Sequence, residues 1–179
     1  MKLAVPDPPL SDGEVALRPF ESKDSGWVAA ACQDEELHRW LPLPRPYGER
    51  DARAYIRRNQ REWGEGTRAT FAVVESTTGE GLGAIALTIH RPGLAEVGYW
   101  VSAERRRAGV ATRAVRLLAG WAFHELHVDR LQLTTHPDNT ASQRVAERAG
   151  FEREGILRAY HATPQGPRDA VMFSLLPGD

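Results

Sequence analysis

The hydrophobic and polar positions of this chain switch repeatedly between two periodicities. Between residues 112 and 126 the apolar side chains recur at the three- and four-residue spacing of a buried helix face. Between residues 130 and 135 they alternate with polar side chains, as in a strand with one buried face. The pattern predicts strands at 15–18, 70–75, 82–90, 95–101, 130–135, 151–157 and 170–176, and helices at 23–32, 35–41, 50–65, 112–126 and 139–149.

These elements interleave along 179 residues, a length that fits one domain with a sizeable core. No internal repeat or low-complexity linker divides them, so an α/β layer fold is expected. Prolines at positions 6, 8 and 9 and a glycine at position 13 set the first residues apart. We therefore predict a flexible N-terminal leader at 1–14 and a single domain at 15–179.

The composition argues against several classes of protein. The net charge is −1, which provides no basic excess to drive nucleic-acid binding. Cys32 is the only cysteine, and the histidines lack paired metal-ligand spacing, so neither a disulfide framework nor a metal site is expected. No stretch has the length and apolarity of a signal-peptide core or a membrane span. We expect a cytoplasmic protein that binds no membrane and no nucleic acid.

A short basic turn between a predicted strand and the most regular predicted helix is the most informative segment. It reads Arg106-Arg107-Ala108-Gly109-Val110-Ala111. A chain that enters a helix here leaves backbone N–H groups without intrahelical partners, at the positive end of the helix dipole. With the arginines, these donors suit a phosphate or pyrophosphate, and Gly109 lets a ligand approach the backbone closely. The turn lacks the motifs of nucleotide-triphosphate and dinucleotide loops, so we expect another phosphate-bearing molecule.

Three motifs follow one another in the second half of the chain. They are a strand-like run from Ala95 to Val101, the loop Arg106-x-x-Gly109-x-Ala111, and Asn139-x-x-Ser142 followed by Val-Ala-Glu-Arg-Ala-Gly-Phe at 145–151. In this order and spacing they resemble the GCN5-related N-acetyltransferase (GNAT) superfamily, and in particular its RimJ/RimL-type ribosomal-protein acetyltransferases. The loop matches the superfamily's Gln/Arg-x-x-Gly-x-Gly/Ala pyrophosphate loop. The resemblance covers about residues 15–176.

The resemblance implies a GNAT fold, with a mixed, mostly antiparallel sheet of about seven strands that is splayed at its middle and flanked by helices. It implies acetyl-CoA as cosubstrate, no metal, and a homodimer, since relatives of this branch are often dimers. Asn139 would touch the pantetheine arm or position the last helix. The residues that the resemblance assigns to the cofactor are Tyr99, Trp100, Val101, Arg106, Arg107, Ala108, Gly109, Val110, Ala111, Thr112, Asn139 and Ser142.

Direct transfer of an acetyl group to an amine needs a base for the ammonium proton, a polarised thioester carbonyl and an acid for the leaving thiolate. Glu96 is the candidate base, because strand alternation places it on the same side as Gly98 and Trp100. An edge-strand carboxylate without a catalytic part, and a chain of waters as base, remain as alternatives. Another branch of the superfamily has its base on the next strand, where this chain has Thr134, which cannot act as a base.

Ser142 is the candidate acid or hydrogen-bond donor to the thiolate, since it shares an inward helix face with Ala146 and Ala149. Capping of the first helical turn is the alternative. Tyr160 is the second candidate acid, although it lies beyond the position of the superfamily's tyrosine, and a strand-edge aromatic is the alternative for it. The residues expected on the acceptor side are Trp40, Tyr47, His90 and Tyr160, and aromatic residues of this kind are also common in cores.

The residues and the resemblance together predict an N-acetyltransferase whose favoured acceptor is a protein or peptide N-terminal α-amino group. A small amine, including an aminoglycoside or another antibiotic, is the alternative acceptor. A non-catalytic acetyl-CoA sensor, which keeps the loop but tolerates an inert Glu96 and Ser142, is a second class of function. Nucleic-acid binding through residues 105–107 is disfavoured by the net charge of −1.

Overall fold

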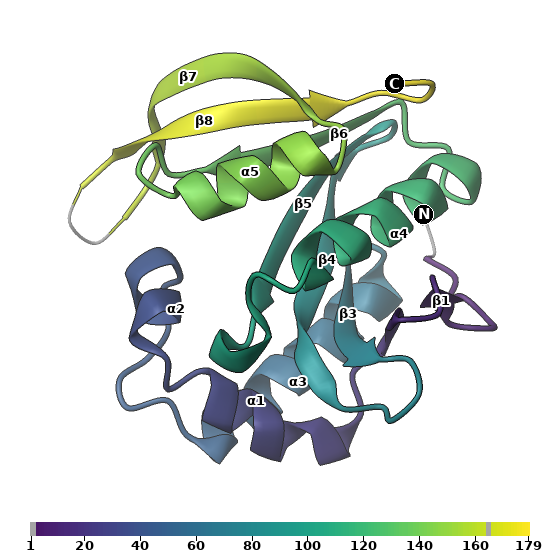
Figure 1. Cartoon of the computed structure of the whole chain (residues 1–179), viewed down its shortest axis with the longest axis vertical. Helices are drawn as coiled ribbons and strands as arrows, with labels where there is room; N and C mark the ends of the chain where they lie inside the picture. The colour runs from purple at the N-terminus through teal and green to yellow at the C-terminus, as the bar shows by residue number, and fades with distance from the viewer. Residues whose placement is uncertain (1–2, 164–165) are drawn as a thin grey trace.

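One eight-stranded sheet runs through the protein, whose computed structural model describes residues 3–163 and 166–179 (Figure 1). The strands are β1 (Leu10–Ser11), β2 (Val15–Pro19), β3 (Arg68–Glu75), β4 (Gly81–Arg91), β5 (Leu94–Val101), β6 (Arg130–Thr135), β7 (Glu152–His161) and β8 (Arg168–Leu175). The helices are α1 (Ser25–Ala31), α2 (Glu35–Trp40), α3 (Glu49–Glu65), α4 (Val110–His124) and α5 (Thr140–Arg148), with 3-10 turns η1 (Ser22–Asp24) and η2 (Ala103–Arg105). The strand order in the sheet is β1-β2-β3-β4-β5-β6-β8-β7.

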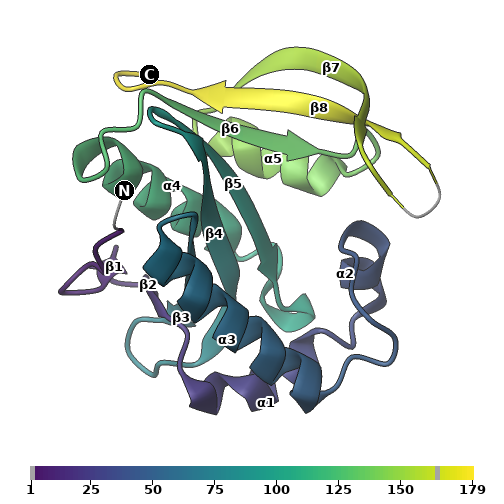
Figure 2. The same ribbon diagram turned by 180° about the vertical axis from the view of Figure 1, so that it is seen from behind.

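The middle of the sheet is where its two halves separate. Neighbouring strands pair antiparallel except β5 and β6, which run parallel and pair only at Leu94–Arg130, Ala95–Leu131 and Glu96–Gln132. Beyond the last of these pairs the two strands diverge, leaving a larger arm, β1–β5, and a smaller arm, β6–β8 (Figures 1 and 2). The splayed, mostly antiparallel sheet that the motifs predicted is thereby confirmed.

Helices cover both faces of the sheet. In β3, Phe71 and Val73 are buried beneath α4, while Ala72 and Val74 are buried on the opposite face beneath α1 and α3 (Figures 1 and 2). Successive residues of a strand point to opposite faces, so a strand covered on both sides is apolar throughout rather than alternating. The face beneath α4 and α5 will be called the α4 face, and the other the α3 face.

The predicted strands and helices are all present, with shifted ends. The predicted helix at 23–32 is divided, because η1 turns the chain before α1 begins at Ser25. The long helix α4 begins at Val110 rather than at residue 112, because Gly109 adopts a left-handed conformation (φ 79°) and serves as its N-cap. Among the described residues, no helix is both long and apolar enough to cross a lipid bilayer.

Part of the segment predicted as a flexible leader packs against the rest of the chain. Leu10 and Ser11 form β1, a strand that the Pro-rich pattern did not predict, and β1 pairs with the predicted strand β2. Leu3 is 3% exposed, and its carbonyl accepts a hydrogen bond from the Trp63 indole at 3.0 Å. Residues 1 and 2 of the predicted leader lie outside the described residues.

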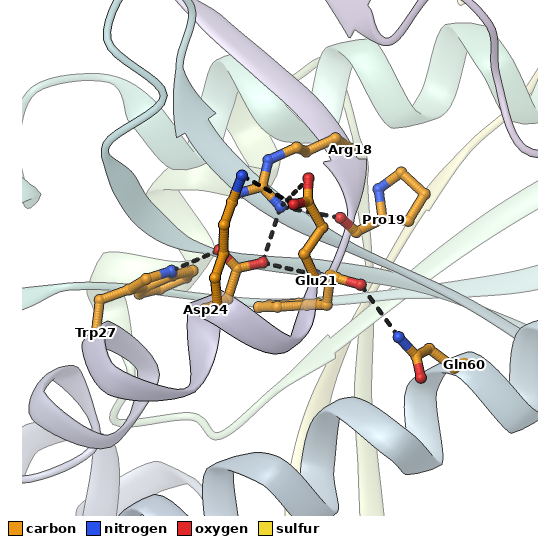
Figure 3. A network of polar contacts seen from close by, with 8 residues as sticks. Arg18, Pro19, Glu21, Asp24, Trp27 and Gln60 are labelled. Carbon is orange, nitrogen blue, oxygen red and sulfur yellow. Dashed lines mark hydrogen bonds and ion pairs between the residues drawn. The ribbon is translucent and has the colours of Figure 1, made fainter.

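A buried ion pair fixes the corner between β2 and α1 (Figure 3). Arg18 donates two hydrogen bonds of 2.8 Å to the carboxylate of Asp24, which is 2% exposed. The same carboxylate accepts from the Trp27 indole at 3.0 Å and from the Glu21 backbone at 2.7 Å. Burial acts to raise the pKa of Asp24, but the Arg18 guanidinium and these donors outweigh it and lower the pKa. The corner holds Trp27 against Trp100 of β5, with ring centroids 5.9 Å apart.

Candidate active site

Glu96 is the last residue of β5 that pairs with β6, so its side chain lies where the two arms begin to separate. Its carboxylate contacts two residues of β6 on the α3 face. The Thr134 hydroxyl donates to Oε1 at 2.7 Å, and the Gln132 amide donates to Oε2 at 3.3 Å. Thr134, a residue that cannot act as a base, thus orients the candidate base from the neighbouring strand.

A third contact to the Glu96 carboxylate comes from His90 of β4. His90 Nε2 lies 2.7 Å from Glu96 Oε2. The pairing of β4 with β5 changes register between Ile89 and Arg91, so His90 is an extra, unpaired residue of the kind found in a β-bulge. Glu96, the predicted base, and His90, predicted on the acceptor side, therefore lie together.

Ser142 lies on the other side of the sheet, on the α4 face. Its hydroxyl is 2.9 Å from the Tyr99 hydroxyl, and the bond crosses from α5 to β5. The Asn139 side chain accepts from the Ser142 backbone N–H at 3.1 Å, which makes Asn139 the N-cap of α5. Burial raises the pKa of Tyr99 to about 12, although the hydrogen bond with Ser142 acts in the opposite direction. Tyr99 is therefore a neutral phenol at physiological pH.

The basic turn connects the end of β5 to the start of α4, as its sequence predicted. Two residues of the turn have positive φ, Arg107 at 62° and Gly109 at 79°. The first backbone N–H groups of α4, at Val110, Ala111 and Thr112, have no carbonyl partner within the helix. A Cβ at position 109 would meet no heavy atom within 4 Å, so the space above this backbone is open. The turn thus offers main-chain donors at a positive helix end to an anion.

A cavity of about 580 Å³ adjoins the turn. Gly109 and Thr112 form one side of it, and three arginines line the rest together with Asp12 and Leu117. These are Arg113 and Arg116 of α4 and Arg148 at the end of α5. Arg113 is paired with Asp12 at 2.9 Å and with Glu14 at 2.8 Å, while Arg116 donates to the Arg148 carbonyl. The three arginines give the cavity the chemistry of a phosphate site.

The short helix α2 contacts the ends of both arms. Asp34 caps α2 and forms an ion pair with Arg106 of the turn, which follows β5. Burial acts to raise the pKa of Asp34, but the Arg106 hydrogen bond and the Glu36 backbone N–H lower it overall. At the other end of α2, the Trp40 ring lies 5.5 Å from that of His136, which follows β6. Figure 1 shows α2 apart from the other helices, on the open side of the sheet.

The remaining predicted residues lie in different surroundings. Trp100 is tilted against Trp27 on the α3 face, and Val101 packs against the core of the α4 face. Tyr47 is 6% exposed within the core of the α3 face, so its ring belongs to that core rather than to an open acceptor surface. Tyr160 is 44% exposed on β7 beside His161, whereas the Ser142–Tyr99 bond joins α5 and β5.

Several residues of the site were not predicted from the sequence. Arg113 and Arg116 lie three residues apart on the helix that follows the turn, a spacing that places them on one face and that would have identified them. Asp34 lies 72 positions before its partner Arg106, and no local pattern joins the two. Gln132 belongs to an alternating strand pattern, and its contact with Glu96 depends on the parallel register of β5 and β6.

The site has two sets of polar groups, both near the point where β5 and β6 diverge. A carboxylate held by three side chains lies on the α3 face, and a pair of hydroxyl groups lies on the α4 face. A carboxylate can accept a proton from an ammonium group, and a hydroxyl pair can donate one to a leaving group. The basic turn follows the same strand, β5, that carries Glu96 and Tyr99.

Known proteins with a similar sequence or structure are acetyltransferases. Residues 14–152 match the family model described as Acetyltransferase (GNAT) domain. The chain is 27% identical over 164 residues to the N-acetyltransferase p20 of Bacillus licheniformis, which covers 90% of this chain and 92% of the relative. Over 59 residues, 33% of this chain and 51% of the relative, it is 37% identical to a kanamycin resistance protein of Rhizobium radiobacter. A Vibrio cholerae structure, proposed to be a ribosomal-protein-serine acetyltransferase, superposes with a TM-score of 0.86 at 25% identity and covers 97% of this chain and 100% of that one.

Proposed function

Since this chain belongs to the GNAT family of acetyltransferases, we propose that it transfers the acetyl group of acetyl-CoA directly to the N-terminal α-amino group of a protein or peptide. The observation that carries the proposal is the position of Glu96. Its carboxylate lies at the divergence of β5 and β6, on the strand that leads into the anion-binding turn. A base and a phosphate site on one strand suit a cosubstrate that has a phosphate-bearing end and a reactive end.

The residues around the turn fit the phosphate-bearing end of acetyl-CoA. The N–H groups of Val110, Ala111 and Thr112, with Arg106 and Arg107, would hold the diphosphate. Arg113, Arg116 and Arg148 line the adjoining cavity and would take the 3′-phosphate of CoA. We place the pantetheine arm along β5 beside Tyr99, Trp100 and Val101.

Acetyl-CoA supplies an acetyl group activated as a thioester, and the chain supplies the proton transfers. Glu96 accepts a proton from the ammonium form of the acceptor, which makes the amine nucleophilic. Ser142 donates a hydrogen bond or a proton to the departing sulfur. Tyr99, as a neutral phenol 2.9 Å from the Ser142 hydroxyl, orients that donor. This assignment needs no covalent enzyme intermediate.

The choice of a peptide amine is supported by the likeness to the V. cholerae structure, which covers nearly the whole chain. A small polycationic amine is the second candidate, supported by the short region of 37% identity to the kanamycin resistance protein. Membership of the GNAT family does not by itself select between the two acceptors, because one fold can host different specificities. Homodimerisation and a cytoplasmic location stay predictions.

The test is release of free CoA thiol from acetyl-CoA with a panel of amines. The panel contains short lysine-containing peptides with a free α-amine, the same peptides acetylated at the N-terminus so that only the lysine amine is free, and kanamycin. We expect turnover with free α-amines and little with the blocked peptides. Turnover with kanamycin alone would support the second candidate. Tight binding of acetyl-CoA, measured by calorimetry, without turnover of any amine would instead identify a sensor.

A further inference from the structure

We propose that His90 is a positioning residue for Glu96, whose carboxylate it holds in its catalytic orientation. The inference rests on the proposed function, because it concerns the same proton transfer. Its basis is the 2.7 Å contact between His90 Nε2 and Glu96 Oε2. An ionised carboxylate only accepts hydrogen bonds, so the proton of this contact belongs to His90 Nε2.

The position of His90 in the strand explains how it reaches Glu96. It is the extra residue where β4 changes register against β5, between the pairs Ile89–Ala95 and Arg91–Leu94. Bulges of this kind redirect a side chain and are common beside active sites. Here the irregularity leaves the His90 ring on the α3 face, where Glu96 also points.

The number of donors around Glu96 leaves room for one more. A carboxylate has about four lone-pair sites. In the described part of the chain, Thr134 donates to Oε1 and both Gln132 and His90 donate to Oε2. The remaining site, on Oε1, is the one that an ammonium group would use. Without His90, the carboxylate loses its shortest contact on the Oε2 side and can rotate away from the acceptor.

Exposure divides the two partners into an inner and an outer group. The Glu96 side chain is 24% exposed and the His90 side chain 40%. His90 therefore lies on the outer side of the pair and Glu96 on the inner side, so loss of the His90 contact frees the carboxylate on its exposed side.

The charged groups on the strands beside His90 and Glu96 are the same in every His90 variant. They are Arg91 on β4, Arg68 on β3, and Arg130 on β6 with its ion-pair partner Glu154 on β7. Gln132 and Thr134 on β6 are neutral. Substitution of His90 leaves these groups in place, so a difference between variants reports on His90.

The experiment compares His90→Gln with His90→Leu in the full chain. The glutamine amide can replace the Nε2–H donor, whereas leucine of similar size offers no donor. We expect H90L to lower kcat about tenfold or more, since a misplaced base loses much of its effect. H90Q should keep most of the activity, and the KM for acetyl-CoA should stay unchanged in both variants. His124→Leu, at an exposed site near the end of α4, is the matched control.

The second readout is the split between kcat and KM in the variants, with one peptide amine as acceptor. A merely structural role of His90 would lower the melting temperature of both variants, whereas a positioning role lowers kcat in H90L and lets H90Q recover it at the same KM for acetyl-CoA. H90L with wild-type kcat, or H90Q as slow as H90L, would overturn the inference. If H90L does not fold, as judged by thermal melting, His90→Ala, which also lacks a donor, takes its place.

Failure of the inference and failure of the proposed function give different results. A wild-type protein that acetylates no amine contradicts the proposed function. A wild-type protein that turns over amines at the same rate as both His90 variants contradicts only the part assigned to His90.

Discussion

The Tyr99 hydroxyl on β5 lies 2.9 Å from the Ser142 hydroxyl on α5, and this hydrogen bond spans the two arms of the sheet. Each hydroxyl group has one proton to donate. If Tyr99 donates to Ser142, the proton of Ser142 remains for a third group. The pKa of Tyr99, raised to about 12 by burial, keeps its proton available at physiological pH.

Substitution of this pair should be non-additive. We expect Ser142→Ala to lower kcat about 100-fold, as loss of a positioned acid does. Tyr99→Phe should cost less, because Ser142 is retained but its proton is no longer directed. The double variant should be no slower than Ser142→Ala, since Tyr99 acts only through Ser142. Steady-state kinetics of the four proteins measure this. Ser76→Ala, at a half-buried serine that is hydrogen-bonded to Ser11 outside the site, is the control. Additive losses would refute the coupling.

Glu96→Gln should remove most of the turnover while it leaves acetyl-CoA binding nearly unchanged. The amide keeps the shape of the side chain but accepts no proton at physiological pH, so kcat should fall about 100-fold or more. Calorimetry with CoA and kcat with a peptide amine separate the two effects. Glu152→Gln, an exposed glutamate on β7, serves as control. Unchanged kcat across pH would leave a water chain as the base.

Gly109→Ala should weaken CoA binding and destabilise the fold. At φ 79° an alanine has a strained backbone, which costs about 1 kcal/mol, and relaxation of the strain would move the amides that face the diphosphate. Gly120→Ala is the matched control, because Gly120 lies inside α4 with open space around its Cβ position. There alanine should stabilise the helix by up to about 1 kcal/mol. Calorimetry with CoA and thermal melting measure both, and equal CoA affinity in the two variants would contradict the prediction.

Arg116→Ala should lower the affinity for CoA but not for dephospho-CoA, which lacks the 3′-phosphate. Arg116 lines the cavity beside the turn with Arg113 and Arg148, and a charge-assisted hydrogen bond to phosphate contributes about 1.5–3 kcal/mol, or roughly tenfold or more in affinity. Isothermal titration with the two ligands measures the difference. Arg144→Ala, an exposed arginine of α5 outside the cavity, is the control. An equal loss for both ligands would place the 3′-phosphate elsewhere.

Asp24→Ala should destabilise the protein by about 3 kcal/mol at pH 7. It removes both 2.8 Å hydrogen bonds of the largely buried Arg18 and leaves that guanidinium with a longer, 3.7 Å ion pair to Glu21. The pKa of Asp24 is lowered by folding, so the stabilisation is present above the usual aspartate pKa, about 3.9, and is lost as the pH falls through the lower folded value. Urea unfolding of both proteins at pH 7 and at low pH measures this. Glu65→Ala, which removes an exposed ion pair with Arg61, should cost less than about 1 kcal/mol. A difference that does not shrink at low pH would contradict the assignment.

The elements of the fold were predictable because their patterns are local. The periodicity of α4, the alternation in β6 and the glycine at the turn each lie within a few neighbouring residues. β1 was missed because two residues among prolines carry no period, and it forms only through pairing with β2. The divided helix at 22–31 was missed because Asp24 and Arg18 become partners only when the chain folds back.

The sequence predicted which elements carry the turn and the two candidate catalytic residues, but it did not predict the residues that contact them. Glu96 and Ser142 could be selected from motif and spacing, and their catalytic parts stay predictions. The contacts of Glu96 with Gln132 and Thr134 depend on the register of two parallel strands that are joined through a helix. The Asp34–Arg106 ion pair depends on the path of the chain between α1 and α3. Such contacts arise from tertiary geometry, which periodicity does not encode.

The point where β5 and β6 separate is the geometric pivot about which any change in the angle between the two arms would occur. If one arm rotates slightly about the pair Glu96–Gln132, atoms far from this pair move most and atoms beside it move least. Tyr99 and Ser142 lie farther along the diverging elements, so their separation would change with the opening angle. Glu96, at the pivot itself, would keep its alignment whether the arms are close together or forced apart by a ligand between them.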